Sequence, residues 1–286
     1  MRTIIVPTDF SIPAGHAVEL AARLALKHGA TLRLVHSVDV PDTWLEGRFT
    51  SAGMARKAPR EQQALYPEAR ERVGRARAEL ERTAAALERR KVKVVHELAP
   101  NAAWKDVMAL AAAHKADLVV MGTHGAGALK EAFIGSNTQR VVRMATVPVI
   151  TLHHAPPARI ANVVVPCDPL EKGLERWIPR LIAPLEGQRV KYHLLYVNTP
   201  GHFQDTDTTL EQLRKVGAKL EPEVALHITD HFSVAEGAMA FANRAGMDMI
   251  ALPTHGRGAI QGFLNASVAE TVANHASIPV ITLRVG

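Results

Sequence analysis

The chain has 286 residues, with 34 lysines and arginines against 28 aspartates and glutamates, a formal net charge of +6. This length allows one large domain or two of ordinary size. The hydrophobic content of 47% excludes global disorder. The single cysteine, Cys167, excludes an internal disulfide and a cysteine-only zinc site. No apolar run approaches the roughly 20 residues that cross a bilayer, and the first residues lack a signal-peptide pattern, so we expect a cytoplasmic protein.

The surplus of positive charge lies in one segment. Residues 56–93 contain 12 lysines and arginines and 6 glutamates, whereas the rest of the chain is balanced at 22 against 22. Nucleic-acid binding favours aromatic residues interleaved with basic ones. Trp44, Phe49 and Tyr66 are too sparse for that pattern, so we expect no nucleic-acid partner.

Apolar periodicity divides the first half of the chain into alternating strands and helices. Short β-branched runs predict buried parallel strands, and apolar residues at helical spacing predict helices between them. The helix after Tyr66 is the clearest, since Pro67 suits a first turn and Val73, Leu80 and Leu87 share a face. In chain order we predict strand 3–6, helix 13–28, strand 31–38, helix 68–90, strand 91–97, helix 102–115, strand 117–121, helix 136–145 and strand 148–152. This alternation is typical of a doubly wound α/β sheet, which binds ligands at the carboxyl ends of its strands.

The second half of the chain repeats the first. Residues 121–152 align without gaps on 252–283 at an offset of 131, and residues from Ile4 align on those from Val163 at an offset of 159. The difference of 28 residues predicts an insertion between the second and third strands of the first copy. We predict domain 1 at 1–152 with a basic insertion at 41–66, a linker at 153–159 and domain 2 at 160–286.

A glycine motif follows the fourth predicted strand. Gly122-Thr-His-Gly125 is separated by nine residues from Gly135-Ser136, which opens a helix. Glycines let backbone N–H groups approach an anion, and a helix N-terminus adds unsatisfied donors, with Ser136 as the expected cap. The motif therefore predicts a phosphate cradle. It is not a P-loop, because Lys130 lies within the spacer.

This spacing, with Asp9 just after the first strand, resembles the nucleotide-binding signature of the universal stress protein family. The flanking segments DLVVMGTHG, GSNTQRV and VPVITL resemble that family too, and the likeness covers both copies. It implies two tandem Rossmann-like (adenine nucleotide alpha hydrolase-like) domains, each a five-stranded parallel sheet with helices on both faces. In the family the last strands mediate dimerisation, so VPVITL and IPVITL are expected to pair in an internal pseudo-dimer.

The resemblance also implies an ATP site in the first copy. The residue after Pro7-Thr8 would face the adenine, the end of the second strand would lie against the base, and the two glycine segments would hold ribose and phosphates. The expected ATP-binding residues are Pro7, Thr8, Asp9, Val38, Met121, Gly122, His124, Gly125, Gly135, Ser136 and Asn137.

The second copy departs from the pattern. Asp168, His255 and Ser267 are retained, but Pro253 replaces the first glycine and Ala266 the third. Proline removes an N–H group, and alanine adds a Cβ where the backbone should touch phosphate. We therefore predict weak or no ATP binding there; a relaxed loop that still admits a ligand is the alternative.

Further chemistry has little support. His153, His154, His227 and His231 lack a third ligand at readable spacing, so no metal is expected. No catalytic residue is assigned, because His124 lacks a readable orienting partner. Cys167 is expected to be a small buried residue rather than a reactive thiol.

The basic insertion has two interpretations. Its first part resembles a lid whose Arg56, Lys57 or Arg60 would reach the phosphates, whereas residues 70–90 read as a solvated Arg/Glu helix face.

Together these features predict an ATP-binding stress-response protein that acts as a switch. Its partners would be an adenine nucleotide and an unidentified protein, with no membrane contact, and a homodimer of tandem chains stays open. The alternatives are a slow ATP-hydrolysing enzyme and a nucleotide-independent interaction module.

Overall fold

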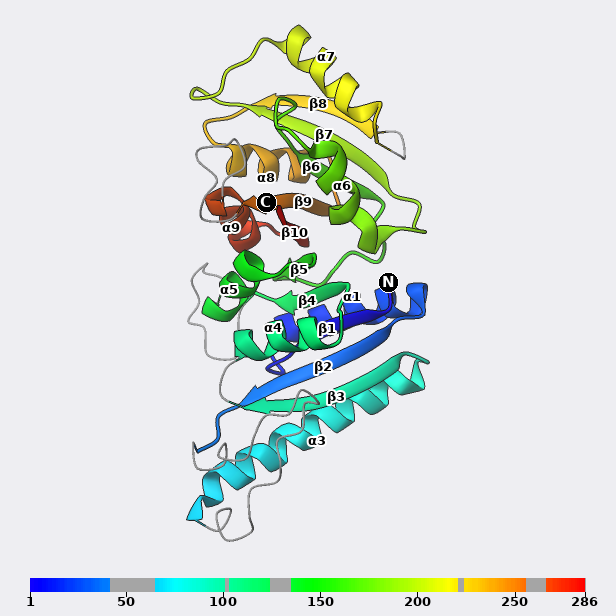
Figure 1. The fold of residues 1–286 in the computed structure, drawn as a ribbon, viewed down its shortest axis with the longest axis vertical. Helices are drawn as coiled ribbons and strands as arrows, with labels where there is room; N and C mark the ends of the chain where they lie inside the picture. The colour runs from blue at the N-terminus through cyan, green and yellow to red at the C-terminus, as the bar shows by residue number, and fades with distance from the viewer. Residues whose placement is uncertain (42–64, 101–102, 124–134, 221–223, 256–265, 286) are drawn as a thin grey trace. The chain divides into compact units, whose positions relative to one another are not determined.

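The computed structural model describes residues 1–41, 65–100, 103–123, 135–220, 224–255 and 266–285 (Figure 1). Packing divides the chain into two compact units, Met1–Ala128 and Leu129–Gly286. Both units are α/β, with parallel strands covered by helices (Figure 1). Among the described residues no helix is both long and apolar enough to cross a membrane.

In the first unit the described strands pair in the order β3-β2-β1-β4, all parallel. Each strand and helix predicted for this region is confirmed, with ends displaced by a few residues. The elements are β1 (Thr3–Pro7), α1 (Ile12–His28), β2 (Thr31–Val38), α3 (Pro67–Arg89), β3 (Lys93–Pro100), α4 (Ala103–Ala113) and β4 (Leu118–Gly122).

Local sequence explains where α1 begins and ends. The Ser11 hydroxyl accepts a hydrogen bond from the backbone N–H of Ala14 (3.3 Å), which caps the first turn. Gly29 ends the helix with a left-handed φ of 63°. The buried face is rich in alanine, including Ala17 and Ala21, so the helix lies close to the sheet.

The second unit contains a six-strand order among its described residues, β5-β10-β9-β6-β7-β8. All neighbours are parallel except β5 and β10, which are antiparallel. The elements are α5 (Ser136–Met144), β5 (Val149–Leu152), β6 (Asn162–Pro166), α6 (Leu174–Ile182), the 3-10 turn η2 (Ala183–Leu185), β7 (Lys191–Asn198), α7 (Thr206–Gly217), β8 (Val224–Asp230), α8 (Val234–Arg244), β9 (Met249–His255), α9 (Ala266–His275) and β10 (Val280–Val285).

The pairing of β5 with β10 confirms the expected association of the two final strands. Ile150 lies opposite Ile281, and these residues are equivalent in the sequence repeat at its offset of 131. The Thr151 hydroxyl donates to the carbonyl of Val280 (3.5 Å), and its equivalent, Thr282, donates to the carbonyl of Val149 (3.4 Å). The two strands are therefore related by a local pseudo-two-fold axis that passes between the two isoleucines.

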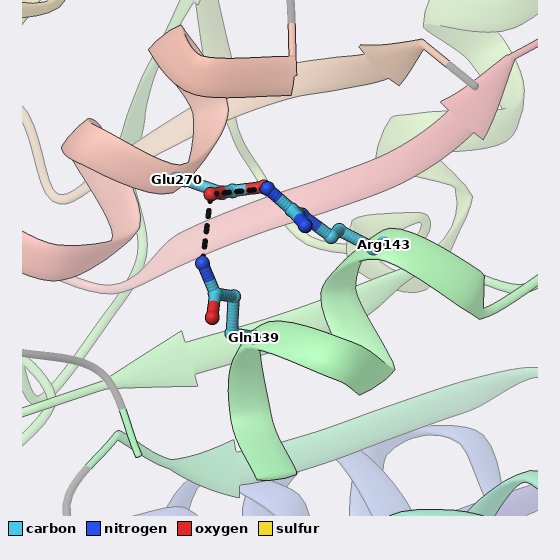
Figure 2. A network of polar contacts seen from close by, with 3 residues as sticks. All are labelled: Gln139, Arg143 and Glu270. Atoms are coloured by element: carbon cyan, nitrogen blue, oxygen red, sulfur yellow. Dashed lines mark hydrogen bonds and ion pairs between the residues drawn. The ribbon is translucent and has the colours of Figure 1, made fainter. Parts of the chain in front are cut away.

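A polar contact between α5 and α9 breaks this symmetry (Figure 2). Gln139 and Glu270 are equivalent positions, and the Gln139 amide donates to the Glu270 carboxylate (2.9 Å). Arg143 adds a bidentate ion pair to the same carboxylate (Figure 2). Because α5 and β5 pack on elements of the second repeat, they belong to the second compact unit.

Candidate functional site

The carboxyl ends of β1, β2 and β4 meet at one edge of the first sheet. The chain runs outward from β1 to β2 and β3 and then returns to place β4 on the other side of β1. This reversal is a topological switch point, the place where doubly wound sheets bind ligands. Pro7, Val38 and Gly122 are the last residues of β1, β2 and β4, so the structure brings these three predicted residues to the switch-point edge.

The turn after β1 holds Asp9 against the start of α1. Thr8 donates its backbone N–H to the carbonyl of Val35 on β2 (2.8 Å). One carboxylate oxygen of Asp9 then accepts hydrogen bonds from the backbone N–H (3.1 Å) and hydroxyl (2.5 Å) of Ser11. Since Ser11 also caps α1, the carboxylate position is linked to the helix N-terminus.

Two aromatic rings support this turn and were not foreseen from the sequence. Phe10 has a left-handed φ of 64°, which is uncommon for a residue with a side chain. Its ring packs on the His36 imidazole with centroids 4.5 Å apart. His36 Nδ1 lies 2.7 Å from the carbonyl oxygen of Thr8. The available signal was the position of His36, two residues before Val38 at the end of β2.

Gly122 is required by helix packing. A Cβ built on it would lie 2.7 Å from the carbonyl carbon of Pro13 and 2.8 Å from the nitrogen of Ala14. Only glycine lets the end of β4 approach the first turn of α1 so closely. The sequence did not reveal this reason, because Pro13 and Ala14 lie more than 100 residues before Gly122 in the chain.

The second repeat differs from the first at this place. Pro253 takes the place of Gly122, and α6 begins at Leu174, which aligns with Gly15 rather than with the first residue of α1. The preceding turn is closed by Asp168, whose side chain accepts the backbone N–H of Leu170 (2.9 Å).

The residues predicted to hold the phosphates lie partly outside the described structure. His124 and Gly125 fall in residues 124–134, as Arg56, Lys57 and Arg60 fall in 42–64, and all five lie outside the described residues. Gly135, Ser136 and Asn137 are described in the second unit, at the start of α5.

The expectation that Ser136 caps α5 is wrong. Gly135 occupies the N-cap position, and Ser136 is the first helical residue. No side-chain hydrogen bond caps this helix within the part of the chain that the structure describes. The N-terminus of an α-helix carries the positive end of the helix dipole, which suits an anion.

One arginine near the insertion reaches the end of β2. Arg72 Nε donates to the carbonyl of Asp39 (3.2 Å), the residue after Val38. Asp39, Tyr66 and Arg72 line a cavity of about 530 Å³. Arg72 is exposed, as expected for a solvated helix face, but its hydrogen bond to the end of β2 was not foreseen from the sequence.

At the matching edge of the second repeat, Asn198 stands where the first repeat has Val38. The Asn198 side chain donates to the carbonyl of Gln204 (3.2 Å) and accepts its N–H (2.9 Å). Tyr196 donates its hydroxyl to the carbonyl of His202 (2.6 Å). These bonds fold the turn after β7 back onto the strand end, where an adenine would need an open apolar surface.

Cys167 follows β6 and is fully buried. Burial, aided by the nearby Asp168, raises the pKa of its thiol well above the ordinary range, so the group stays protonated. This environment matches a small buried residue in a turn rather than a nucleophile. Within the described ranges, no group of three or more His, Cys, Asp or Glu side chains is placed to hold a metal ion.

The fold and the geometry of the two edges define a tandem α/β protein. The switch-point edge of its first repeat has the predicted glycine at the end of β4, and the edge of its second repeat has proline there. The model of the universal stress protein family matches residues 1–153 and again 160–284. The chain therefore belongs to the universal stress protein family and carries two tandem domains of it.

Relatives and solved structures agree with this assignment. A universal stress protein of Thermus aquaticus is 31% identical over 149 residues, 52% of this chain and 96% of that protein. One of Mycolicibacterium smegmatis is 24% identical and covers 98% of this chain and 96% of its own length. The crystal structure of a universal stress protein from Archaeoglobus fulgidus shares the fold, with a TM-score of 0.71 at 18% identity over 99% of this chain and 98% of that one.

Proposed function

We propose that this chain is a nucleotide-dependent switch in stress response that binds ATP in the first repeat and binds it weakly or not at all in the second. Family membership supports a nucleotide-binding stress protein. The observation that carries the finer proposal is the difference between the two switch-point edges. Asp9, Val38 and Gly122 frame the first, whereas Asp168, Asn198 and Pro253 frame a second edge closed by its own turns.

Each element of the first edge has a chemical part in this proposal. Asp9 presents a carboxylate oriented by Ser11, which can accept an adenine amino group. Val38 is 5% exposed and offers an apolar contact for the base. Arg72 brings a cation to the same strand end. The family resemblance assigns the phosphates to Gly135, Ser136 and Asn137 at the start of α5. We keep 1–152 and 160–286 as the proposed limits of the two domains.

The test uses a matched pair of substitutions in the full chain. Gly135→Val and Ala266→Val place the same side chain at equivalent positions of the two repeats. ATP binding measured by isothermal titration calorimetry is expected to be lost in the first variant and unchanged in the second. Equal losses would refute the asymmetry, and no binding of ATP by the unaltered chain would leave an interaction module as the function.

Turnover separates a switch from an enzyme. We expect ATP to be released unchanged, with phosphate production well below about one per minute, a rate far under the usual enzyme range. Faster turnover that His124→Ala abolishes would establish the ATP-hydrolysing alternative.

A further inference from the structure

Two histidines share a hydrogen bond inside the second unit. His193 on β7 and His227 on β8 have Nδ1 and Nε2 2.9 Å apart, and their rings stack with centroids separated by 5.1 Å. His193 is only 7% exposed. Phe241 of α8 covers the His227 ring at 4.9 Å between centroids. The pair therefore lies between the sheet and α8. It joins β7 to β8, which is the last strand in the described order.

One arrangement of protons satisfies both contacts of His193. His193 Nε2 lies 3.4 Å from Oδ1 of Asn162, an oxygen that can only accept. In this arrangement His193 donates from Nε2 to Asn162 and accepts at Nδ1 from the Nε2–H of His227. A single added proton can bind to Nδ1 of His227, which leaves this hydrogen bond in place. Two added protons place N–H groups and positive charges against each other, which breaks the bond.

The charged groups around the pair do not stabilise a second proton. Lys191 on β7 acts on both rings as a neighbouring cation. From α8, Arg244 donates to the Thr229 hydroxyl (3.4 Å), while Glu236 lies at the other end of the helix and pairs with His231. Asp248, before β9, already accepts the backbone N–H groups of Ala161 and Asn162.

The first repeat holds the equivalent position with different chemistry. Strand register places Val35 beside Glu97 in the first unit and Leu195 beside His227 in the second. By the same register His193 is the counterpart of Arg33. Arg33 and Glu97 form an ion pair at 3.6 Å with side chains 20% and 14% exposed. Neither residue of this ion pair is a histidine, so the first repeat lacks an imidazole pair at this place.

We propose that the His193–His227 pair is an acid-sensitive joint that loosens the outer strand β8 from β7 when the pH falls below neutrality. The device is confined to the second repeat, because the first repeat carries Arg33–Glu97 at the same place. It is independent of nucleotide binding and gives the degenerate repeat a response of its own.

The direction of the effect follows from proton linkage. Desolvation by burial is the main cause that lowers the pKa of both imidazoles, and the charge of Lys191 lowers them further. When β8 has opened from β7, the exposed imidazoles have a pKa near the ordinary value of about 6.5. The open state therefore binds more protons than the closed state just below that pH. The joint is therefore fully stable above about pH 6.5 and weakens as the pH falls through the open-state value toward the lower closed-state values.

Hydrogen–deuterium exchange of the full chain tests this proposal. Protection factors, corrected for intrinsic exchange at each pH, are compared between pH 7.5 and 5.5 for peptides covering Val224–Asp230 and Lys93–Pro100. For β8 we expect the protection factor to fall about tenfold per pH unit below pH 6.5 for each proton taken up on opening. For β3 we expect no comparable change.

Two variants make the result specific. His193→Arg with His227→Glu transplants the pair of the first repeat and is expected to abolish the acid-dependent loss. His202→Gln alters an exposed histidine of the same repeat and should leave the loss intact. A β8 protection that does not change with pH, or one that falls equally in the transplanted variant, would overturn the proposal. Should the transplant fail to fold, NMR titration of the unaltered chain decides, since ring pKa values of 6.5 or above for both histidines would also overturn it.

Discussion

Single residues that we propose to bind nucleotide at the switch-point edge also have packing roles. Gly122 belongs to a motif that indicates phosphate contact, yet its immediate neighbours are backbone atoms of Pro13 and Ala14. Asp9 is oriented by the serine that caps α1. The position of α1 and the positions of Asp9 and Gly122 are thus set by the same few atoms. The second repeat has proline in place of the glycine and starts its helix later.

Gly122→Ala should therefore destabilise the protein even without nucleotide. A Cβ at 2.7 Å from backbone carbon forces β4 and α1 apart, and overpacking of this kind costs about 1–3 kcal/mol. Urea unfolding of the ligand-free chain measures this loss of stability.

Gly15→Ala is the matched control, since Gly15 lies in α1 with open space around its Cβ position. This change should stabilise the chain by about 0.5–1 kcal/mol through helix propensity. A similar loss in both variants would show that α1 is sensitive to any added methyl group and would contradict a specific clash at Gly122.

Cys167 is expected to be unreactive while the protein is folded. Burial raises its thiol pKa, so little thiolate forms, and its side chain is inaccessible. Iodoacetamide at pH 8 should leave the native chain unmodified by mass spectrometry and label it fully in denaturing urea. Rapid labelling of the native chain would instead indicate a reactive thiol at the second ligand edge.

At the scale of elements, α5 and α9 show how an internal duplication becomes asymmetric. Two identical helices about this axis would put like side chains at the Gln139 and Glu270 positions. The chain instead has an amide and an arginine on α5 facing a carboxylate on α9 (Figure 2). The facing side chains of α5 and α9 are therefore complementary, whereas two copies of either helix would place like side chains opposite each other.

Arg143→Ala should lower the free energy of unfolding by about 1 kcal/mol, because the Glu270 side chain is 12% exposed and loses its charged partner. Exchanging the charges with Arg143→Glu and Glu270→Arg should recover most of the loss seen in either single reversal. A double-mutant cycle in urea measures the coupling.

Arg82→Ala provides the control, since Arg82 and Glu79 form an ion pair on the exposed face of α3 with side chains 70% and 43% exposed. Its effect should be close to zero. If Arg143→Ala has no larger effect than Arg82→Ala, the α5–α9 contact contributes nothing to the association of the two repeats.

At the scale of the whole molecule, duplication gives two edges of which we propose that only the first takes ATP. Native mass spectrometry of the full chain should accordingly show one nucleotide for each chain at saturation. Arg72→Ala should weaken that binding by roughly tenfold, the effect of about 1.4 kcal/mol from one lost charged contact.

Lys191→Ala is the control for this change, because Lys191 is an exposed cation of the second repeat. Its affinity for ATP should equal that of the unaltered chain. Two nucleotides bound with similar affinity would contradict the asymmetry between the repeats.

Much of this architecture was predictable because it depends on patterns close together in the chain. Apolar periodicity located the elements of the first repeat, internal identity revealed the duplication, and the family resemblance indicated the pairing of VPVITL with IPVITL. The cap of α5 was mispredicted because serine and glycine both suit an N-cap, and neighbouring sequence does not decide between Gly135 and Ser136.

The sequence by itself determined the α/β class, the tandem repeat and the family, since each rests on local periodicity or on motifs read along the chain. Only the tertiary structure decided which residues from distant segments meet. The close approach of Gly122 to α1, the reach of Arg72 to the end of β2 and the His193–His227 bond all join positions whose distance depends on strand order and register. Those contacts follow from the packing of whole elements, which no single stretch of sequence encodes.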